Sequence, residues 1–196
     1  AALTAAGRPV PVRTLLAPRY ARLRLRALTG VAGIDREILH PTVQRPGLAL
    51  AGYAKLVNPG RIQIFGASEN TFLDELPEAQ RSVAVWHVLS REPAGIVVSH
   101  DGALGREVVD AAVRAGIAVL ATPLRSSVFI EELHEILAET LLPVAVHRGV
   151  LLDVLGVGCL ITGPGGIGKS QCGLELVARG HRLVADGQVE VRRYPP

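Results

Sequence analysis

A glycine-rich run that ends in a lysine and a serine is the feature of this sequence that most restricts the possible fold. The run "GPGGIGKS" fits the pattern G-x-x-x-x-G-K-[ST]. Its members are Gly163, Pro164, Gly165, Gly166, Ile167, Gly168, Lys169 and Ser170. Glycine lets backbone N–H groups approach a phosphate closely and adopt positive φ without a steric clash. The pattern therefore predicts a phosphate-binding loop between a strand and a helix.

The segments on either side of the run have the character that such a loop requires. The apolar segment "VGCLIT" predicts a buried strand before it, and "KSQCGLELVARG" predicts a helix after it, with Leu174, Leu176 and Val177 on its inner face. The free N–H groups and the dipole of that helix add positive potential at the loop. We expect Lys169 to contact the outer phosphates and Ser170 to offer a hydroxyl to Mg²⁺.

An acidic residue for the same site is expected soon after that helix. The run "LVAD" places Asp186 at the end of an apolar segment, and the residues before it leave room for one helix and one adjacent strand. Lys169 and Asp186 are therefore expected to share a site. The alternative is an acid that only ends a strand. Upstream, "VAVHRGVLLDVLGVGCLITG" predicts two strands joined by a turn at Gly156, and "HRLVAD" and "QVEVRR" are two further candidate strands.

Composition and charge argue against several classes of protein. A net charge of +3, spread evenly, is too small to indicate a nucleic-acid-binding protein. The longest apolar stretch is interrupted by His147, Arg148 and Asp153, which argues against a membrane span. We expect a soluble cytoplasmic protein without nucleic-acid or membrane partners. Cys159 and Cys172 are expected to be buried, reduced thiols.

Strands alternate with helices from residue 61 onward. The segments "RIQIFG", "AGIVVSH" and "IAVLAT" predict strands, and "PEAQRSVAVWHVLSR", "LGREVVDAAVRAG" and "SSVFIEELHEILAETLL" predict helices. The apolar residues expected on the first helix are Val83, Val85, Trp86 and Leu89. Those expected on the third are Phe129, Leu133, Ile136, Leu137 and Leu141. This alternation predicts an α/β fold with a parallel sheet.

The remaining segments of the first half are less regular. "VRTLLAPRYARL" is weakly helical with an interruption at Pro18, "LRALTG" and "REILH" predict strands, and "RPGLALAG" predicts a loop. The stretch "VSHDG" is assigned a structural or loop role, although it follows a strand in a position where α/β sheets often bind ligands. Pro143 ends the last helix, so we expect an N-terminal α/β domain over 1–142 and a phosphate-loop domain over 143–196.

Together these segments resemble the HPr kinase/phosphorylase family. The resemblance rests on "HRGVLLDVLGVGCLITGPGGIGKS", its continuation "LELVARGHRLVADGQVEVRR", and the upstream pieces "RPGLALAG", "RIQIFG" and "GIAVLATPLRSS". It implies a regulatory or assembly domain of α/β type with a parallel sheet. The start of a P-loop kinase domain similar to phosphoenolpyruvate carboxykinase would follow.

The resemblance also implies an activity. Members of this family are bacterial, cytoplasmic, bifunctional enzymes that use ATP, or pyrophosphate, with Mg²⁺ to phosphorylate a serine of HPr. HPr is the phosphocarrier protein of the sugar phosphotransferase system. The same enzymes remove that phosphate by phosphorolysis with inorganic phosphate, assemble as homohexamers, and serve carbon catabolite regulation.

The implied site residues follow position by position. Gly163 to Ser170 would bind the nucleotide phosphates, with Lys169 neutralising developing charge and Ser170 meeting Mg²⁺. Asp186 matches the first aspartate of the family's "ADD" and would lie near the metal. His147 matches the histidine of the family's "HG" pair, close to the phosphates, and the alternative for His147 is a purely structural histidine.

Three departures from the family pattern leave the activity open. Gly187 replaces the second aspartate, which is thought to act as base and acid. The sequence therefore shows no residue for the proton transfer. Arg148 separates His147 from Gly149. The family's later glycine-rich signature is absent, so we expect the domain to be incomplete at its C-terminus, and without methionine Ala1 is not an initiator. The alternatives are a non-catalytic nucleotide-binding regulator and an interaction or scaffold fragment.

Overall fold

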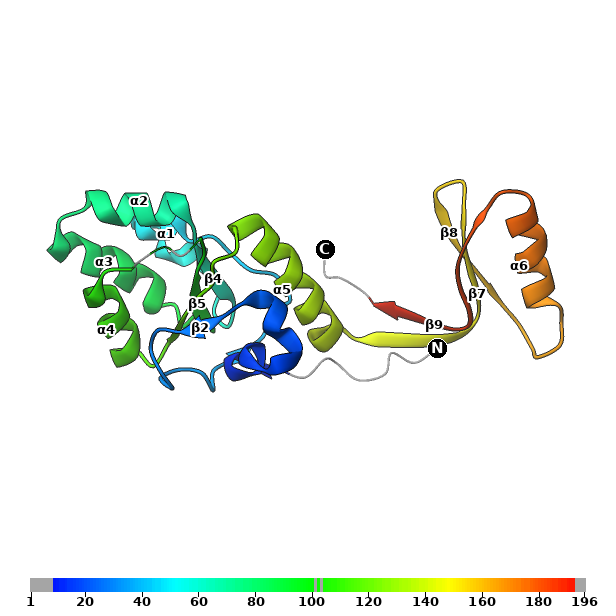
Figure 1. Cartoon of the computed structure of the whole chain (residues 1–196), viewed down its shortest axis with the longest axis horizontal. Coiled ribbons are helices and arrows are strands. Elements are labelled where there is room, and N and C mark those ends of the chain that lie inside the picture. The colour runs from blue at the N-terminus through cyan, green and yellow to red at the C-terminus, as the bar shows by residue number, and fades with distance from the viewer. Residues whose placement is uncertain (1–8, 101, 103, 193–196) are drawn as a thin grey trace. The chain divides into compact units, whose positions relative to one another are not determined.

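The computed structural model describes residues 9–100, 102 and 104–192, and the chain divides into two compact units, residues 8–141 and 142–196. The strands of the first unit are β1 (Val10–Pro11), β2 (Arg26–Ala27), β3 (Glu37–Ile38), β4 (Ile62–Phe65), β5 (Gly95–Val98) and β6 (Ala118–Ala121). Its α-helices are α1 (Gly47–Leu50), α2 (Ala67–Glu75), α3 (Glu78–Leu89), α4 (Arg106–Arg114) and α5 (Ser126–Leu141) (Figure 1). Its 3-10 helices are η1 (Val12–Leu16), η2 (Pro18–Leu23) and η3 (Ala54–Leu56). The second unit contains β7 (Val144–Val154), β8 (Val157–Thr162), α6 (Lys169–Ala178) and β9 (Arg182–Arg192).

A four-stranded sheet in the order β2-β6-β5-β4 forms the centre of the first unit. Strands β4, β5 and β6 are parallel, with Ile62 opposite Gly95 and Gly95 opposite Ala118, and the short β2 is antiparallel to β6. Every residue of the three parallel strands is buried. Such uniform burial is typical of parallel strands covered by helices on both faces. The predicted α/β fold with a parallel sheet is confirmed.

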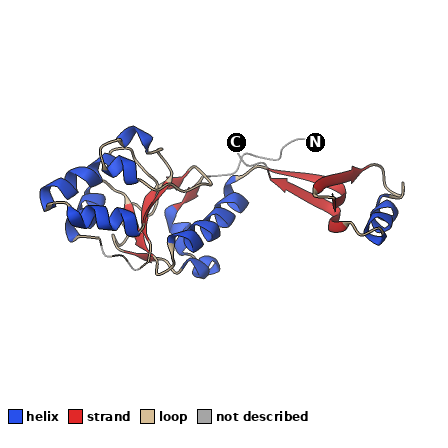
Figure 2. Ribbon diagram, turned by 90° about the horizontal axis from the view of Figure 1, so that it is seen from above, coloured by secondary structure: helices blue, strands red, loops and turns tan. Residues whose placement is uncertain are grey.

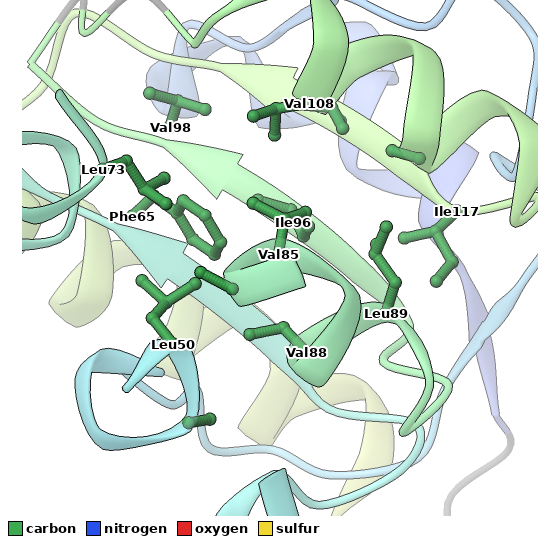
Figure 3. Close-up of a cluster of buried hydrophobic side chains, with 14 of the residues drawn as sticks. Leu50, Phe65, Leu73, Val85, Val88, Leu89, Ile96, Val98, Val108 and Ile117 are labelled. Atoms are coloured by element: carbon green, nitrogen blue, oxygen red, sulfur yellow. The ribbon is translucent and has the colours of Figure 1, made fainter. Parts of the chain in front are cut away.

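Two hydrophobic clusters lie on the two faces of this sheet. One packs Phe65 and Ile96 against α2, α3 and α4, as Figure 3 shows. The other packs Ile64 and Val97 against α5 and the 3-10 helices η1 and η2. Neighbouring residues of β5 enter opposite clusters because side chains alternate along a strand. These two layers of helix give the first unit its core.

The helix predictions of the first unit are confirmed in one case and wrong in part in another. On α5, the expected stripe is buried from Phe129 to Leu137, and its last member, Leu141, is half-buried against the same cluster. On α3, Val83 and Trp86 are instead 56% and 58% exposed. The residues of α3 that are buried are Ala84, Val85, Val88 and Leu89. The helix is therefore rotated so that its other apolar stripe meets the sheet.

Two short helices of the first unit were not expected from the sequence. The predicted loop "RPGLALAG" contains α1, so that prediction is wrong: Ala49 and Leu50 are buried, and the Leu50 N–H donates to the Pro46 carbonyl. The helix α2 begins after Gly66, whose N–H donates to Glu69 Oε2 at 2.9 Å. Tertiary burial stabilises both helices where local propensity is weak. The predicted strands "LRALTG" and "REILH" shorten to two residues each.

The second unit is an antiparallel sheet in the order β8-β7-β9 with α6 beside it (Figure 2). The hairpin between β7 and β8 turns at Leu155 and Gly156, as predicted, and Asp153 Oδ1 accepts the Gly156 N–H at 2.8 Å. "HRLVAD" and "QVEVRR" form one continuous strand, β9, not two. Because β7 lies between β8 and β9, the expectation that the strand of Asp186 adjoins the loop strand is wrong.

Burial in the second unit also differs from the expectation. Leu174 and Val177 are 67% and 38% exposed, so the predicted inner face of α6 is wrong at these two positions, whereas Leu176 is half-buried. Instead α6 approaches the sheet at Gly173, where a Cβ would lie 2.9 Å from Val150 Cγ1. The absence of a side chain at Gly173 lets the helix come close. Cys159 is half-buried and Cys172 is exposed, so their predicted burial is wrong as well.

Candidate phosphate-binding site

The loop between β8 and α6 has the backbone that the sequence pattern predicts. Gly166 and Gly168 adopt φ of +78° and +97°, a region that other residues rarely occupy. A Cβ built on Gly165 or Gly166 would meet no atom of the described chain within 4 Å. Crowding therefore does not explain the glycines at 165 and 166; the positive φ of Gly166 requires glycine there, and the open space leaves room for a ligand to approach the main chain.

The loop borders a hollow of about 300 Å³ at the start of α6. The hollow is lined by Gly166, Gly168, Lys169, Ser170 and Gln171. Lys169 is half-buried, and its Nζ donates to the Pro164 carbonyl oxygen at 2.7 Å. The ammonium group thus closes the loop on itself and lies at the hollow. The sequence analysis did not identify Gln171 as a site residue, although its position directly after Ser170 places it next to the predicted loop.

Ser170 and Asp186 meet at the same place from different elements. The Ser170 hydroxyl, on the first turn of α6, donates to Asp186 Oδ1 of β9 at 3.3 Å. An irregularity in the ladder lies close by: Leu151 is opposite Ala185, but Leu152 is opposite Leu183. A bulge of this kind redirects the side chains of its strand. The structure therefore brings Lys169, Ser170 and Asp186 into one site although β7 separates β8 from β9.

His147 does not join this group. It lies on β7 opposite the buried Val189, whereas Asp186 lies opposite Val150. Since His147 and Val150 are three positions apart on one strand, their side chains point to opposite faces of the sheet. The predicted catalytic set is therefore divided: Lys169, Ser170 and Asp186 are on the α6 face, and His147 is on the other face.

The position after Asp186 carries no side chain that transfers a proton. Gly187 has φ of +89° and lies opposite Gly149. A Cβ added to Gly187 would meet no described atom within 4 Å. The glycine is thus required by its backbone conformation and not by crowding.

The candidate site offers oxygen ligands for a cation from Ser170 and Asp186. Among residues 9–100, 102 and 104–192 there is no group of three or more His, Cys, Asp or Glu side chains that fits a metal ion. The Ser170 hydroxyl and the Asp186 carboxylate are hard oxygen donors within 3.3 Å of each other. Mg²⁺ commonly takes one or two protein ligands and completes its shell with phosphate oxygens and water, so these residues fit Mg²⁺.

One of the hollows of the first unit, of about 220 Å³, lies at the carboxyl end of β5. Its lining includes Asn70, Ser99 and His100, and His100 has a φ of +67°. Asp101, the acid of the "VSHDG" stretch, lies outside the described residues. The structural role assigned to that stretch stays a prediction.

Comparison with known proteins bears on both units. The family description "HPr Serine kinase N terminus" matches residues 10–137, and "HPr Serine kinase C-terminal domain" matches residues 139–196. The chain belongs to the HPr kinase/phosphorylase family. An HPr kinase/phosphorylase from Geobacter sulfurreducens is 43% identical over 178 residues, which cover 89% of this chain and 54% of that protein. One from Bacillus subtilis is 38% identical over 172 residues, 88% of this chain and 56% of that protein.

The chain therefore spans about half the length of the HPr kinases/phosphorylases that it matches. Among solved structures, the CBS and DRTGG domains of the regulatory region of a Clostridium perfringens pyrophosphatase align with a TM-score of 0.44 at 13% identity. That alignment covers 63% of this chain and 48% of the other, and it is too weak to bear on fold or ligand. No helix in the described part of the chain is long and apolar enough to cross a membrane.

Proposed function

We propose that this chain provides the N-terminal domain and the phosphate-binding part of a bifunctional HPr kinase/phosphorylase. The reaction transfers a phosphoryl group from ATP or pyrophosphate to a serine of HPr, and the reverse reaction removes it with inorganic phosphate. One observation carries the proposal: the Ser170 hydroxyl contacts the Asp186 carboxylate at 3.3 Å directly beside the loop that holds Lys169. This arrangement supports phosphoryl transfer, where positioning and charge stabilisation are the main demands on the protein.

Each residue of the site has a defined task in this proposal. The N–H groups of Gly163 and of residues 165–168 hold the phosphate chain, and the Lys169 ammonium neutralises charge on its outer oxygens. Ser170 and Asp186 would hold Mg²⁺, which would supply positive charge to stabilise the phosphate oxygens. His147 is assigned no contact with the phosphates, because it lies on the other face of the sheet from Asp186.

A second candidate function is a nucleotide-binding regulator that does not transfer phosphate. Gly187 favours it, since a glycine cannot accept the proton of the serine hydroxyl. The open space around Gly187 allows either a partner's side chain or a water to take that position. The two candidates share the nucleotide site and differ only in proton transfer.

The wider setting follows from the same proposal. HPr as substrate places the reaction in the bacterial cytoplasm and in carbon catabolite regulation. We assign the first unit a role in regulation or in assembly of a homohexamer. Measuring the mass of the full-length protein in solution tests the assembly, and a monomer at micromolar concentration would contradict it.

Nucleotide binding is the first test. We expect Lys169→Ala to lose most of its affinity for ATP and pyrophosphate, about tenfold or more, because a charged contact to phosphate is removed. Isothermal titration with the full-length protein, with and without Mg²⁺, measures this. Arg179→Gln, at the far end of α6, is the matched control that removes a charge elsewhere. Unchanged ATP affinity in Lys169→Ala would refute the assigned role.

Phosphoryl transfer separates the two candidates. The full-length protein, incubated with ATP, Mg²⁺ and HPr, is expected to yield phosphoserine. If it binds ATP but yields none, the regulator is the correct function. Gly187→Asp then tests whether only the base is missing, with Gly187→Asn as a control of equal size without a base. The positive φ of this position makes both variants less stable, by about 1–2 kcal/mol.

A further inference from the structure

The geometry points to Arg148 as a second cation for the phosphate chain, an inference that rests on the proposed function of the loop. Arg148 lies on β7, the central strand of the second unit, between the strand that leads into the loop and the strand that carries Asp186. In the sequence it stands out only as the residue between His147 and Gly149. Its position in the sheet indicates a role in binding phosphate oxygens.

Arg148 lies on the same face of β7 as Val150. The two residues are two positions apart in a strand whose residues alternate, so both side chains leave the sheet on one side. Val150 is the residue against which α6 packs, at Gly173. It also lies opposite Asp186, which Ser170 contacts. The Arg148 side chain therefore leaves the sheet on the face that carries the phosphate site.

Arg148 also lies at the level of the loop along the strand. Gly149 is opposite Thr162, the last residue of β8, so the chain enters the loop at Gly163 next to Arg148. On its other side Arg148 is opposite Gln188, a neutral residue two positions after Asp186. Arg148 thus has the start of the loop on one side, while the carboxylates of Asp186 and Glu190 on β9 lie diagonal to it on the same face and not directly opposite.

The charge of Arg148 is not engaged elsewhere. In the described part of the second unit, Arg179, Arg182 and Arg192 each pair with a carboxylate, namely Glu175, Asp153 and Glu190. Arg148 is exposed and forms no ion pair or side-chain hydrogen bond within the described residues. A free guanidinium beside a phosphate loop is suited to bidentate contact with phosphate oxygens. Arg148 supplies this contact in addition to Lys169.

Pyrophosphate binding to the full-length protein tests this inference. Arg148→Gln is expected to weaken pyrophosphate binding roughly tenfold, and Arg148→Lys to recover part of the loss, because the charge returns without the bidentate geometry. Arg179→Gln is the control, since it removes a charge from an exposed i,i+4 pair of the same unit. Circular dichroism of each variant is expected to match that of the parent protein.

The outcomes distinguish the inference from the proposed function. If Lys169→Ala loses pyrophosphate affinity while Arg148→Gln binds as well as Arg179→Gln, the role of Arg148 is overturned and the loop keeps its function. If the parent protein binds neither pyrophosphate nor ATP, both fail. A loss confined to Arg148→Gln and Lys169→Ala, with folding unchanged, supports both.

Discussion

Different interactions stabilise the interior of each of the two units. In the first, three parallel strands are buried at every position between two layers of helix. In the second, the buried apolar residues within the described range are Leu142, Val150, Leu152 and Val189. The second unit depends instead on its long β7–β9 ladder and on close backbone contacts at glycines. The unit with the smaller core is the one that carries the candidate phosphate site.

The largest effect that tests this difference is expected in the first core. Phe129→Ala is predicted to lower the free energy of unfolding of the first unit by about 3–5 kcal/mol, because Phe129 is fully buried. Leu174→Ala, 67% exposed on α6, is expected to change stability by about 0.5 kcal/mol at most. Urea unfolding followed by the fluorescence of Trp86, the single tryptophan, reports on the first unit, and unfolding followed by circular dichroism reports on both units. Equal losses of unfolding free energy in the two variants would contradict the proposed difference between the two units.

A smaller effect is expected from glycines of the second unit. A Cβ on Gly149 would lie 2.4 Å from the Ile161 carbonyl oxygen, so Gly149→Ala is predicted to destabilise the sheet by about 1–3 kcal/mol. Gly158→Ala is the control, because no described atom lies within 4 Å of its Cβ. That variant is expected to be neutral or slightly stabilising. Urea unfolding followed by circular dichroism compares them, and equal midpoints would show that close approach at Gly149 does not matter.

The smallest effect concerns pH and the first unit. Burial lowers the pKa of His134 below its ordinary value of 6.5, and its Nε2 accepts the Val43 N–H at 3.3 Å. A lowered pKa in the folded state favours the neutral ring. The contribution is therefore complete above pH 6.5 and is lost as the pH falls toward the folded-state pKa. Burial and the nearby Arg61 lower the pKa of His40 in the same direction.

His134→Gln separates the two histidines. Glutamine keeps an acceptor for the Val43 N–H but does not titrate. The loss of stability as the pH falls below 6.5 is therefore expected to shrink but not vanish, because His40 accounts for the rest. Urea midpoints across this range measure it. An unchanged pH dependence would show that burial of His134 is not coupled to folding.

The sequence predicts the regular parts of both units well. The stripe on α5, the three parallel strands and the glycine loop follow from periodicity and spacing, because each depends on nearby residues. The helix α1 does not, since one turn forms there only when Ala49 and Leu50 are buried. The face of β7 on which His147 lies depends on strand register, which pairing between distant segments decides. The exposure of Leu174 follows from where Gly173 meets Val150.

The hydrogen bond from Lys169 to the Pro164 carbonyl has a consequence for how the loop admits an anion. The Lys169 ammonium group has three N–H donors, and this bond uses one of them. An anion that enters the hollow would therefore meet an ammonium group that is already held at the loop and still has donors for its oxygens. Because this long side chain is ordered before the anion arrives, less conformational entropy would be lost on binding.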